Sequence, residues 1–183
     1  QGVMMKIRYF MAVFIWMGNM LFAGEFTLFS NDLSGQLTKT QEGLGFGCDG
    51  SNTSPELHWT HAPSGTKSFA VTVYDADAPT GSGWWHWLVF NIPATQTSLP
   101  TNFGDMSKKS SIHAIQSITD SGKYGFIGAC PPKGDKAHRY FFTVHALSVD
   151  TLNLDEKASP AHVGFMINAN TISKATLVAY YQR

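Results

Sequence analysis

The chain has 183 residues, with 13 basic and 13 acidic side chains and a formal net charge of zero. This length suits one domain plus a short targeting segment, and it is long enough to bury a hydrophobic core without help from metals. Because its longest basic run is Lys108-Lys109, the sequence lacks the concentrated basic face of a nucleic-acid-binding protein. With 14% charged and 13% aromatic residues, the composition excludes a disordered chain and favours a compact β-rich domain.

Residues 1–23 have the pattern of a secretory signal peptide. Lys6 and Arg8 precede short apolar runs that end at the small residue Ala23. A positive start, a short apolar middle and a small final residue are typical of cleaved export signals. We therefore expect the mature chain to start near Gly24 and to be periplasmic or secreted. The alternative is an uncleaved membrane anchor.

The chain contains two cysteines, Cys48 and Cys130. An even number of cysteines in an exported protein favours one disulfide, and the alternative is two free buried thiols. Each cysteine stands beside a loop rich in glycine or proline, and neither belongs to a Cys-x-x-Cys motif, so a redox enzyme is not indicated.

Six segments alternate apolar and polar residues with period two, which predicts β-strands. They are residues 25–29, 56–61, 68–75, 84–92, 138–149 and 174–181. Clusters of glycine and proline separate them. One late helix is predicted, with Ser159 as its N-cap, Pro160 as its first residue and an end near Asn170.

The apolar side of this helix is expected to be formed by four residues, Val163, Phe165, Met166 and Ile167. Many short strands and one late helix predict a mainly β fold, an antiparallel sandwich with a peripheral helix. We expect a single domain over residues 24–183. Residues 1–3 stand before two methionines and are interpreted as a cloning remnant or an upstream start.

Candidate binding residues occur first between two of the predicted strands. The strand at 68–75 ends in Asp75, and a loop rich in glycine and proline leads to the next strand and His86. If these strands pair as neighbours, Asp75 and His86 lie at the same end of the sheet, where the carboxylate can fix the imidazole tautomer. By period two, Trp84 and Leu88 share the face of His86 and give it apolar surroundings.

The second group of candidates begins the strand at 138–149. His138 and Tyr140 are two residues apart, so they point the same way, and the same face continues into the core. An imidazole and a phenol on one apolar face are suitable donors for an oxyanion. Taken singly, a strand histidine is more often a core residue and an Asp-x-Asp motif more often a turn device. Arg139 is expected to form a structural ion pair or to cover the opposite face.

Together these motifs resemble the phosphatidylethanolamine-binding family. The resemblance rests on Asp-x-Asp-x-Pro at 75–79, Trp-x-His at 84–86, Pro-Pro-Lys-Gly at 131–134 and His-Arg-Tyr at 138–140. It extends over about residues 26–181, and residues 45–55 and 159–170 look like the bacterial branch of the family. It implies a two-sheet antiparallel sandwich with a small anion pocket at one end.

Carried over by motif, the ligand-binding residues are Asp75, Asp77, Pro79, His86, Cys130, His138 and Tyr140. Two positions depart from the family pattern. Ala76 replaces the usual proline between the aspartates, which loosens that loop. Cys130 stands where eukaryotic members often have a glycine whose backbone N–H meets the anion. With both cysteines beside loops that the family places around the pocket, we predict a disulfide between Cys48 and Cys130.

The leading functional hypothesis is an exported, non-catalytic binding protein for phosphate-like groups, such as a lipid head group, a phosphorylated metabolite or a phosphorylated side chain. It requires no cofactor. One alternative is a metal-dependent hydrolase, since aspartate and histidine are common metal ligands. Another is a regulator of a protease or kinase that acts through its surface. The sequence identifies no protein partner. It leaves the oligomeric state undecided between a monomer and a homodimer.

Overall fold

The computed structural model describes residues 24–183, so the predicted signal peptide lies outside the described residues. No helix in this described part of the chain is both long and apolar enough to cross a membrane. The elements in chain order are β1 (Thr27–Phe29), β2 (Leu44–Gly45), β3 (Cys48–Asp49), β4 (Leu57–Thr60), β5 (Ser68–Asp75), β6 (Trp84–Pro93), β7 (Ser98–Leu99), β8 (Ile115–Gln116), β9 (His138–Leu147), α1 (Pro160–Asn170) and β10 (Thr171–Tyr181).

The larger sheet is antiparallel and has the order β10-β9-β5-β6-β8. Strand β5 is its centre, because it pairs with β6 on one side and with β9 on the other. Both of its faces are covered, so seven of its eight residues are buried. Such a strand needs apolar side chains on both sides, and the run from Phe69 to Val73 supplies them.

The smaller sheet, β1-β4-β7, covers one face of the larger one and is also antiparallel. The main core lies between the two sheets, where Trp59 of β4 meets Phe69 of β5 edge to face at 5.2 Å between ring centroids. Leu57 and Leu99 from the smaller sheet are completely buried in this core. This arrangement is the predicted two-sheet antiparallel sandwich.

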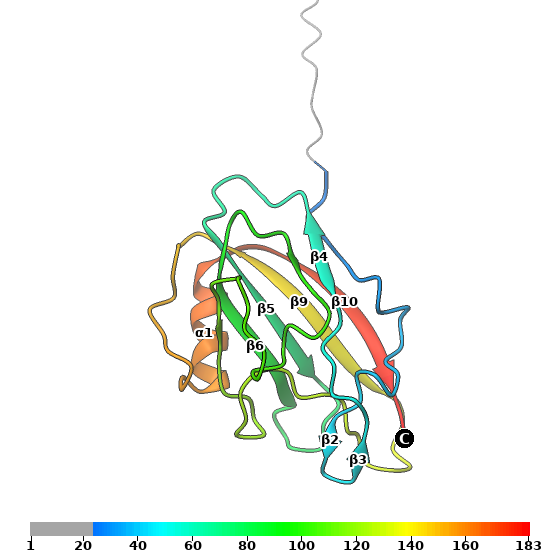
Figure 1. The fold of residues 1–183 in the computed structure, drawn as a ribbon. Coiled ribbons are helices and arrows are strands. Elements are labelled where there is room, and N and C mark those ends of the chain that lie inside the picture. Colours follow the sequence, from blue (N-terminus) through cyan, green and yellow to red (C-terminus); the bar gives the residue numbers. More distant parts are fainter. Residues whose placement is uncertain (1–23) are drawn as a thin grey trace, which may run out of the picture.

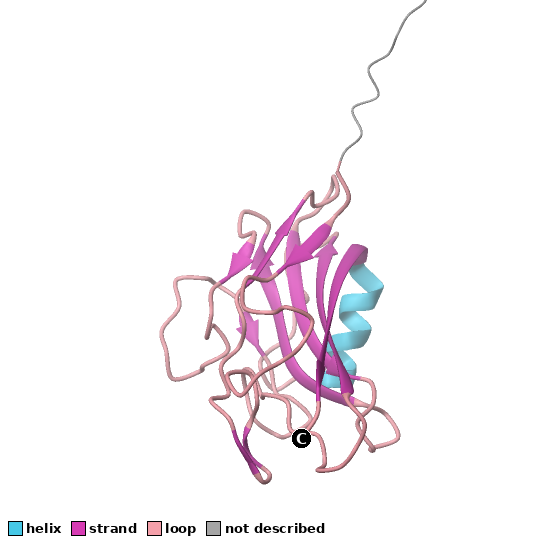
Figure 2. Cartoon of the chain, turned by 90° about the vertical axis from the view of Figure 1, so that its right-hand side faces the viewer, coloured by secondary structure: helices cyan, strands magenta, loops and turns pink. Residues whose placement is uncertain are grey.

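Helix α1 packs on the opposite face of the larger sheet, as Figures 1 and 2 show. Its N-cap is Ser159, whose hydroxyl accepts a hydrogen bond from the backbone N–H of His162 at 3.3 Å, and the helix runs over the predicted residues. Val163 and Ile167 are buried against the sheet, as expected. Phe165, which was predicted on the apolar side, is instead exposed.

Gly164, next to Phe165, is the residue that faces the sheet. A Cβ atom at Gly164 would make an ordinary van der Waals contact with the Trp85 ring, at 3.5 Å, so this turn of the helix packs directly on that ring. Phe165 follows Gly164 by one residue, which turns its side chain about 100° away from the sheet and towards solvent. The period of 3.6 residues places the buried stripe on Val163, Gly164 and Ile167, and the size of Phe165 gave the misleading signal.

The short hairpin of β2 and β3 projects at the end of the molecule that holds the C-terminus (Figure 1). A disulfide between Cys48 of β3 and Cys130 ties this hairpin to the loop before β9, which confirms the predicted pairing. The hairpin turn has three consecutive residues with positive φ, Gly45, Phe46 and Gly47. Glycine at two of these positions lets the chain turn tightly without steric strain.

Candidate functional site

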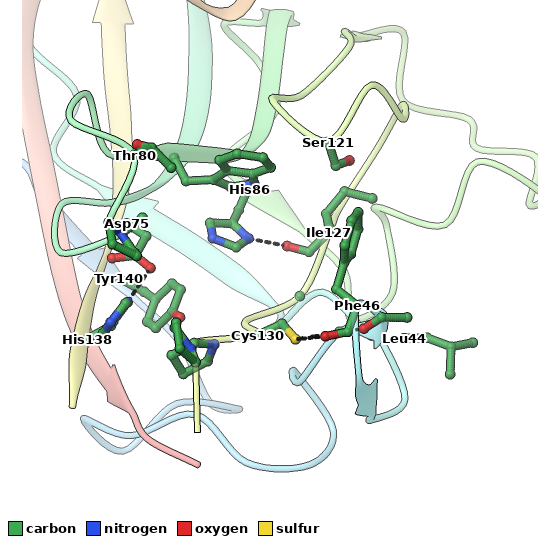
Figure 3. Close-up of a pocket in the computed structure, with 18 residues that line it drawn as sticks. Leu44, Phe46, Asp75, Thr80, His86, Ser121, Ile127, Cys130, His138 and Tyr140 are labelled. Atoms are coloured by element: carbon green, nitrogen blue, oxygen red, sulfur yellow. Dashed lines mark hydrogen bonds and ion pairs between the residues drawn. The ribbon is translucent and has the colours of Figure 1, made fainter. Parts of the chain in front are cut away.

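A cavity of about 220 Å³ opens at the end of the larger sheet where β5 ends and where β6 and β9 begin. Four segments meet around it: the β2–β3 hairpin, the loop between β5 and β6, residues 121–132 and the start of β9. The polar side chains that line it are those of Asp75, Thr80, His86, Ser121, His138 and Tyr140 (Figure 3). Antiparallel pairing brings these residues together from positions as far apart as 75 and 140.

Asp75 and His138 form a buried pair on one side of the cavity. The Asp75 Oδ2 atom lies 2.8 Å from His138 Nδ1, and both side chains are almost fully buried. The other oxygen of Asp75, Oδ1, accepts the backbone N–H of Asp77 at 2.8 Å. The outer ring nitrogen of His138, Nε2, lies 3.4 Å from Asp135 Oδ2. The carboxylate that was predicted to orient His86 therefore orients His138.

His86 occupies a β-bulge in strand β6. Val73 pairs with Trp87 and the next residue of β5, Tyr74, pairs with Trp85, so His86 is the extra residue between them. A bulge of this kind turns one side chain out of the regular alternation. His86 thus faces the cavity beside Tyr140, with 5.3 Å between ring centroids, and does not share the face of Leu88, which packs on the helix side.

The backbone and the burial around His86 define its chemistry. Its Nδ1 lies 2.7 Å from the carbonyl oxygen of Ile127. Burial lowers the pKa of His86 below its ordinary value, although that carbonyl and the charges of Asp75 and Asp120 act in the opposite direction. Trp84, also on the cavity wall, supplies part of the apolar surroundings that were predicted for this histidine.

Tyr140 lies between the two histidines and is 1% exposed. Its hydroxyl is one of few buried polar side-chain atoms in residues 24–183 without a hydrogen-bond partner. Burial raises the pKa of Tyr140 well above its ordinary value, and the nearby negative charge of Asp75 raises it further. The hydroxyl therefore keeps its proton and is a neutral donor beside the cavity. His138 and Tyr140 point the same way, as period two predicts.

The structure does not bring Asp77 into the cavity wall with the other candidates. Its carboxylate binds the Arg139 guanidinium at 2.8 and 2.9 Å and also accepts the Arg139 backbone N–H at 2.9 Å. The hydrogen bonds from Arg139 hold the pKa of Asp77 well below its ordinary range. Arg139 thus forms the structural ion pair that was expected of it, and this pair fixes the loop after β5 against β9.

Pro79 and Cys130 line the cavity, in agreement with their expected positions. Leu44 and Phe46 of the β2–β3 hairpin line it as well, although they were not among the candidates. Their side chains are 68% and 72% exposed, so the hairpin presents apolar surface beside the cavity. The available signal was their alternation with three glycines at 43–47, which places apolar side chains in a hairpin too short to bury them.

Within residues 24–183, no group of three or more His, Cys, Asp and Glu side chains is arranged to hold a metal ion. The cavity instead offers a tyrosine hydroxyl, two imidazoles and one carboxylate inside an apolar rim. This set of groups is suited to hydrogen bonding with a small polar ligand.

Comparison with known proteins places this chain in a family. The profile of the phosphatidylethanolamine-binding protein family matches residues 32–182. YbcL of Escherichia coli strain K12 is 52% identical over 163 residues, which cover 87% of this chain and 89% of YbcL. YbhB of the same strain is 48% identical over 156 residues, which cover 84% of this chain and 98% of YbhB.

Solved structures with a similar fold come from the same family as these relatives. The crystal structure of E. coli YbcL, presented as a new member of the mammalian PEBP family, matches with a TM-score of 0.85 over 87% of this chain and 99% of that chain. A PEBP homologue from Chlamydia trachomatis, 27% identical, matches with a TM-score of 0.71 over 86% of this chain and 97% of that one. The chain therefore belongs to the phosphatidylethanolamine-binding protein family.

Proposed function

We propose that this protein is an exported, non-catalytic binding protein whose cavity takes a small phosphate-like anion. The observation that carries the proposal is the Tyr140 hydroxyl, which is fully buried beside the cavity and has no partner in the described chain. An unpaired buried hydroxyl costs roughly 1–3 kcal/mol, so the fold keeps this donor at the expense of stability. A ligand oxygen would satisfy it.

The shape and chemistry of the cavity support a small ligand head. A volume of about 220 Å³ is below the range of most drug-sized pockets and fits a phosphoryl group with a short substituent. His86 and His138 both line the cavity with Tyr140, and the ring nitrogens of His138 already face Asp75 and Asp135. The carboxylate of Asp75 already accepts two hydrogen bonds, from His138 and from the Asp77 backbone, so it serves to hold the donors.

Export is proposed on separate grounds. The disulfide between Cys48 and Cys130 is of the kind that persists in oxidising compartments such as the periplasm. Together with the signal-like sequence at 1–23, it supports a periplasmic or secreted protein. The natural occupant of the cavity is then a lipid head group, a phosphorylated metabolite or a phosphorylated side chain outside the cytoplasm.

Isothermal titration calorimetry with methyl phosphate tests the binding function. Tyr140→Phe should weaken binding roughly tenfold to a hundredfold, because a hydrogen bond to a charged group contributes about 1.5–3 kcal/mol. Tyr180→Phe removes the same hydroxyl from a tyrosine outside the cavity wall and should leave the affinity unchanged. Equal affinity in all three proteins would place the site elsewhere, and steady release of inorganic phosphate would favour a hydrolase.

Stability provides the complementary measurement. If the Tyr140 hydroxyl serves a ligand, ligand-free Tyr140→Phe should unfold at the same or a higher denaturant concentration than the wild type, because the change removes an unsatisfied buried group. A marked loss of stability would show that the hydroxyl is structural instead. The two measurements together separate a binding role from a packing role.

A further inference from the structure

The hydrogen bond between His86 and Ile127 fixes which nitrogen of the imidazole faces the cavity as an acceptor. His86 Nδ1 lies 2.7 Å from the Ile127 carbonyl oxygen (Figure 3). A carbonyl oxygen can only accept, so Nδ1 must carry the hydrogen. In the neutral imidazole, Nε2 is then left with a lone pair and no hydrogen. A neutral His86 therefore offers an acceptor to the ligand, and not the donor that an anion requires.

Most other polar side chains of the cavity already have protein partners. The two ring nitrogens of His138 face Asp75 and Asp135. The Thr80 hydroxyl donates to the Gly83 carbonyl, and the Ser121 hydroxyl bonds to that of Thr119. Tyr140 supplies a single O–H donor, and its oxygen has no partner of its own. Asp75 is already an acceptor for two N–H groups, and a carboxylate beside the cavity repels an anion. A phosphoryl group with two negative charges would thus meet one neutral donor, one lone pair and one like charge.

His86 is surrounded by ionisable groups from three directions. Asp75 lies at the end of β5, His138 and Tyr140 lie on β9, and Asp120 precedes Ser121 in the cavity wall. The charges of Asp75 and Asp120 favour imidazolium, but burial opposes them and has the larger effect on the pKa of His86. His86 is therefore neutral in the ligand-free protein near pH 7.5.

We propose that the cavity binds a terminal phosphoryl group together with one proton, shared between His86 Nε2 and a phosphoryl oxygen, and so prefers phosphate monoesters to diesters. This inference rests on the proposed function. A monoester has a second pKa near 6, so it is mostly a dianion at pH 7.5 and a proton must come from the solvent when it binds. A diester has no oxygen that holds a proton in this range, so its binding would require the whole proton to reside on the His86 imidazole, which burial disfavours.

Proton uptake is the direct test. Calorimetric titration of the protein with methyl phosphate at pH 7.5, in two phosphate-free buffers of different ionisation enthalpy, yields the number of protons taken up per ligand. We expect close to one, and an affinity that falls about tenfold between pH 7 and pH 8. Binding with less than about a quarter of a proton, or with a flat pH profile, would overturn the inference while leaving the proposed function intact. No binding at any pH from about 5.5 to 8 would overturn both.

A matched pair of variants assigns the proton to His86. In His86→Gln the amide N–H₂ can donate to the phosphoryl oxygen without taking up a proton. The number of protons taken up per ligand should fall to near zero, and the affinity should no longer depend on pH. Both changes are expected even if the variant binds methyl phosphate more weakly. His162→Gln makes the same change at an exposed position on α1, outside the cavity wall, and should retain the uptake of the wild type. Unchanged uptake in His86→Gln would place the proton on another group.

A comparison of two esters tests the preference without a difference in charge. Near about pH 5.5, methyl phosphate and dimethyl phosphate both carry a single negative charge, and only the monoester has a P–OH group. We expect the monoester to bind at least about tenfold more tightly, since its hydroxyl can donate to Nε2. Equal affinities would show that the cavity does not distinguish a ligand with a P–OH group from one without it, and would overturn the inference.

Discussion

Asp75 lies directly opposite Tyr140 in the pairing of β5 with β9, yet its carboxylate binds the diagonal neighbour, His138, at 2.8 Å. The Tyr140 hydroxyl, by contrast, has no hydrogen-bond partner within residues 24–183. One hydroxyl donor is thus available beside the cavity. The pair of Asp75 and His138 places a hydrogen-bonded carboxylate in the interior, where loss of its charge is costly.

We predict that Asp75→Asn lowers the free energy of unfolding by about 2–3 kcal/mol, because it breaks a buried, charge-assisted hydrogen bond. Asp135 provides the matched control, since its carboxylate approaches the other nitrogen of the same imidazole at 3.4 Å but is 47% exposed. Asp135→Asn should cost less than about 1 kcal/mol, as exposed ion pairs do. Urea denaturation of the three proteins measures both values, and equal effects would contradict the prediction.

The sequence predicted those parts of the fold in which pattern and packing agree. The strand at 68–75 was located with both of its ends, because β-branched and aromatic residues are followed there by a turn of aspartate, glycine and proline. His138 and Tyr140 share a face because β9 is regular over that stretch. The two-residue strands β7 and β8 were missed, since no period can be recognised over two residues.

The sequence could not predict features that depend on register. The bulge at His86 reverses the face of one residue, and nothing in the local alternation marks it. The choice of His138 over His86 as the partner of Asp75 follows from strand pairing and not from the short loop that separates Asp75 and His86 in the chain. Arg139 captures Asp77 for a similar reason, because β9 lies beside the end of β5.

His145 gives the protein a pH-dependent stability that is separate from the cavity. It is buried on β9, 3.4 Å from the hydroxyls of Thr72 and Thr171, and opposite Lys174 of β10. Burial lowers the pKa of His145 from 6.5 to about 4, and the charge of Lys174 contributes. Because the unfolded chain binds the proton first, stability is complete above about pH 6.5 and decreases as the pH falls towards 4.

At pH 5 the expected loss from His145 is roughly 2 kcal/mol relative to pH 7.5. His145→Gln should remove this part of the pH dependence, so that the difference between pH 7.5 and pH 5 becomes smaller than in the wild type. Thermal or urea denaturation at the two pH values measures it. His162→Gln, at an exposed site, should keep the behaviour of the wild type. An identical pH dependence in all three proteins would contradict the assignment.

The disulfide should contribute strongly to stability because it closes a long loop. Cys48 and Cys130 are 82 residues apart. In the chain-entropy model, closing a loop of this length lowers the entropy of the unfolded chain and so stabilises the folded protein by roughly 4.5 kcal/mol. The double variant Cys48→Ser, Cys130→Ser should lose a large part of that value in denaturation experiments. Thiol counting of the denatured, unreduced wild type should find no free thiols, whereas two per chain would contradict the bond itself.

The last prediction concerns the apolar rim that Leu44 and Phe46 form at the cavity mouth. Phe46 is 72% exposed, so an apolar substituent on a bound ligand would cover part of its ring. Covering about 40 Å² of apolar surface contributes roughly 1 kcal/mol, which corresponds to about fivefold in affinity. Phe46→Ser should therefore weaken binding of phenyl phosphate by about that factor and leave methyl phosphate unchanged.

Phe165→Ser is the matched control for this experiment, because Phe165 is 69% exposed on α1 and does not line the cavity. The ratio of phenyl phosphate to methyl phosphate affinity is the quantity to compare, since it cancels any general effect of the hairpin on the phosphoryl site. A lower ratio in Phe46→Ser alone would show that the hairpin selects ligands by the group attached to the phosphate. An equal loss for both esters would mean instead that Phe46 only holds the hairpin in place over the cavity.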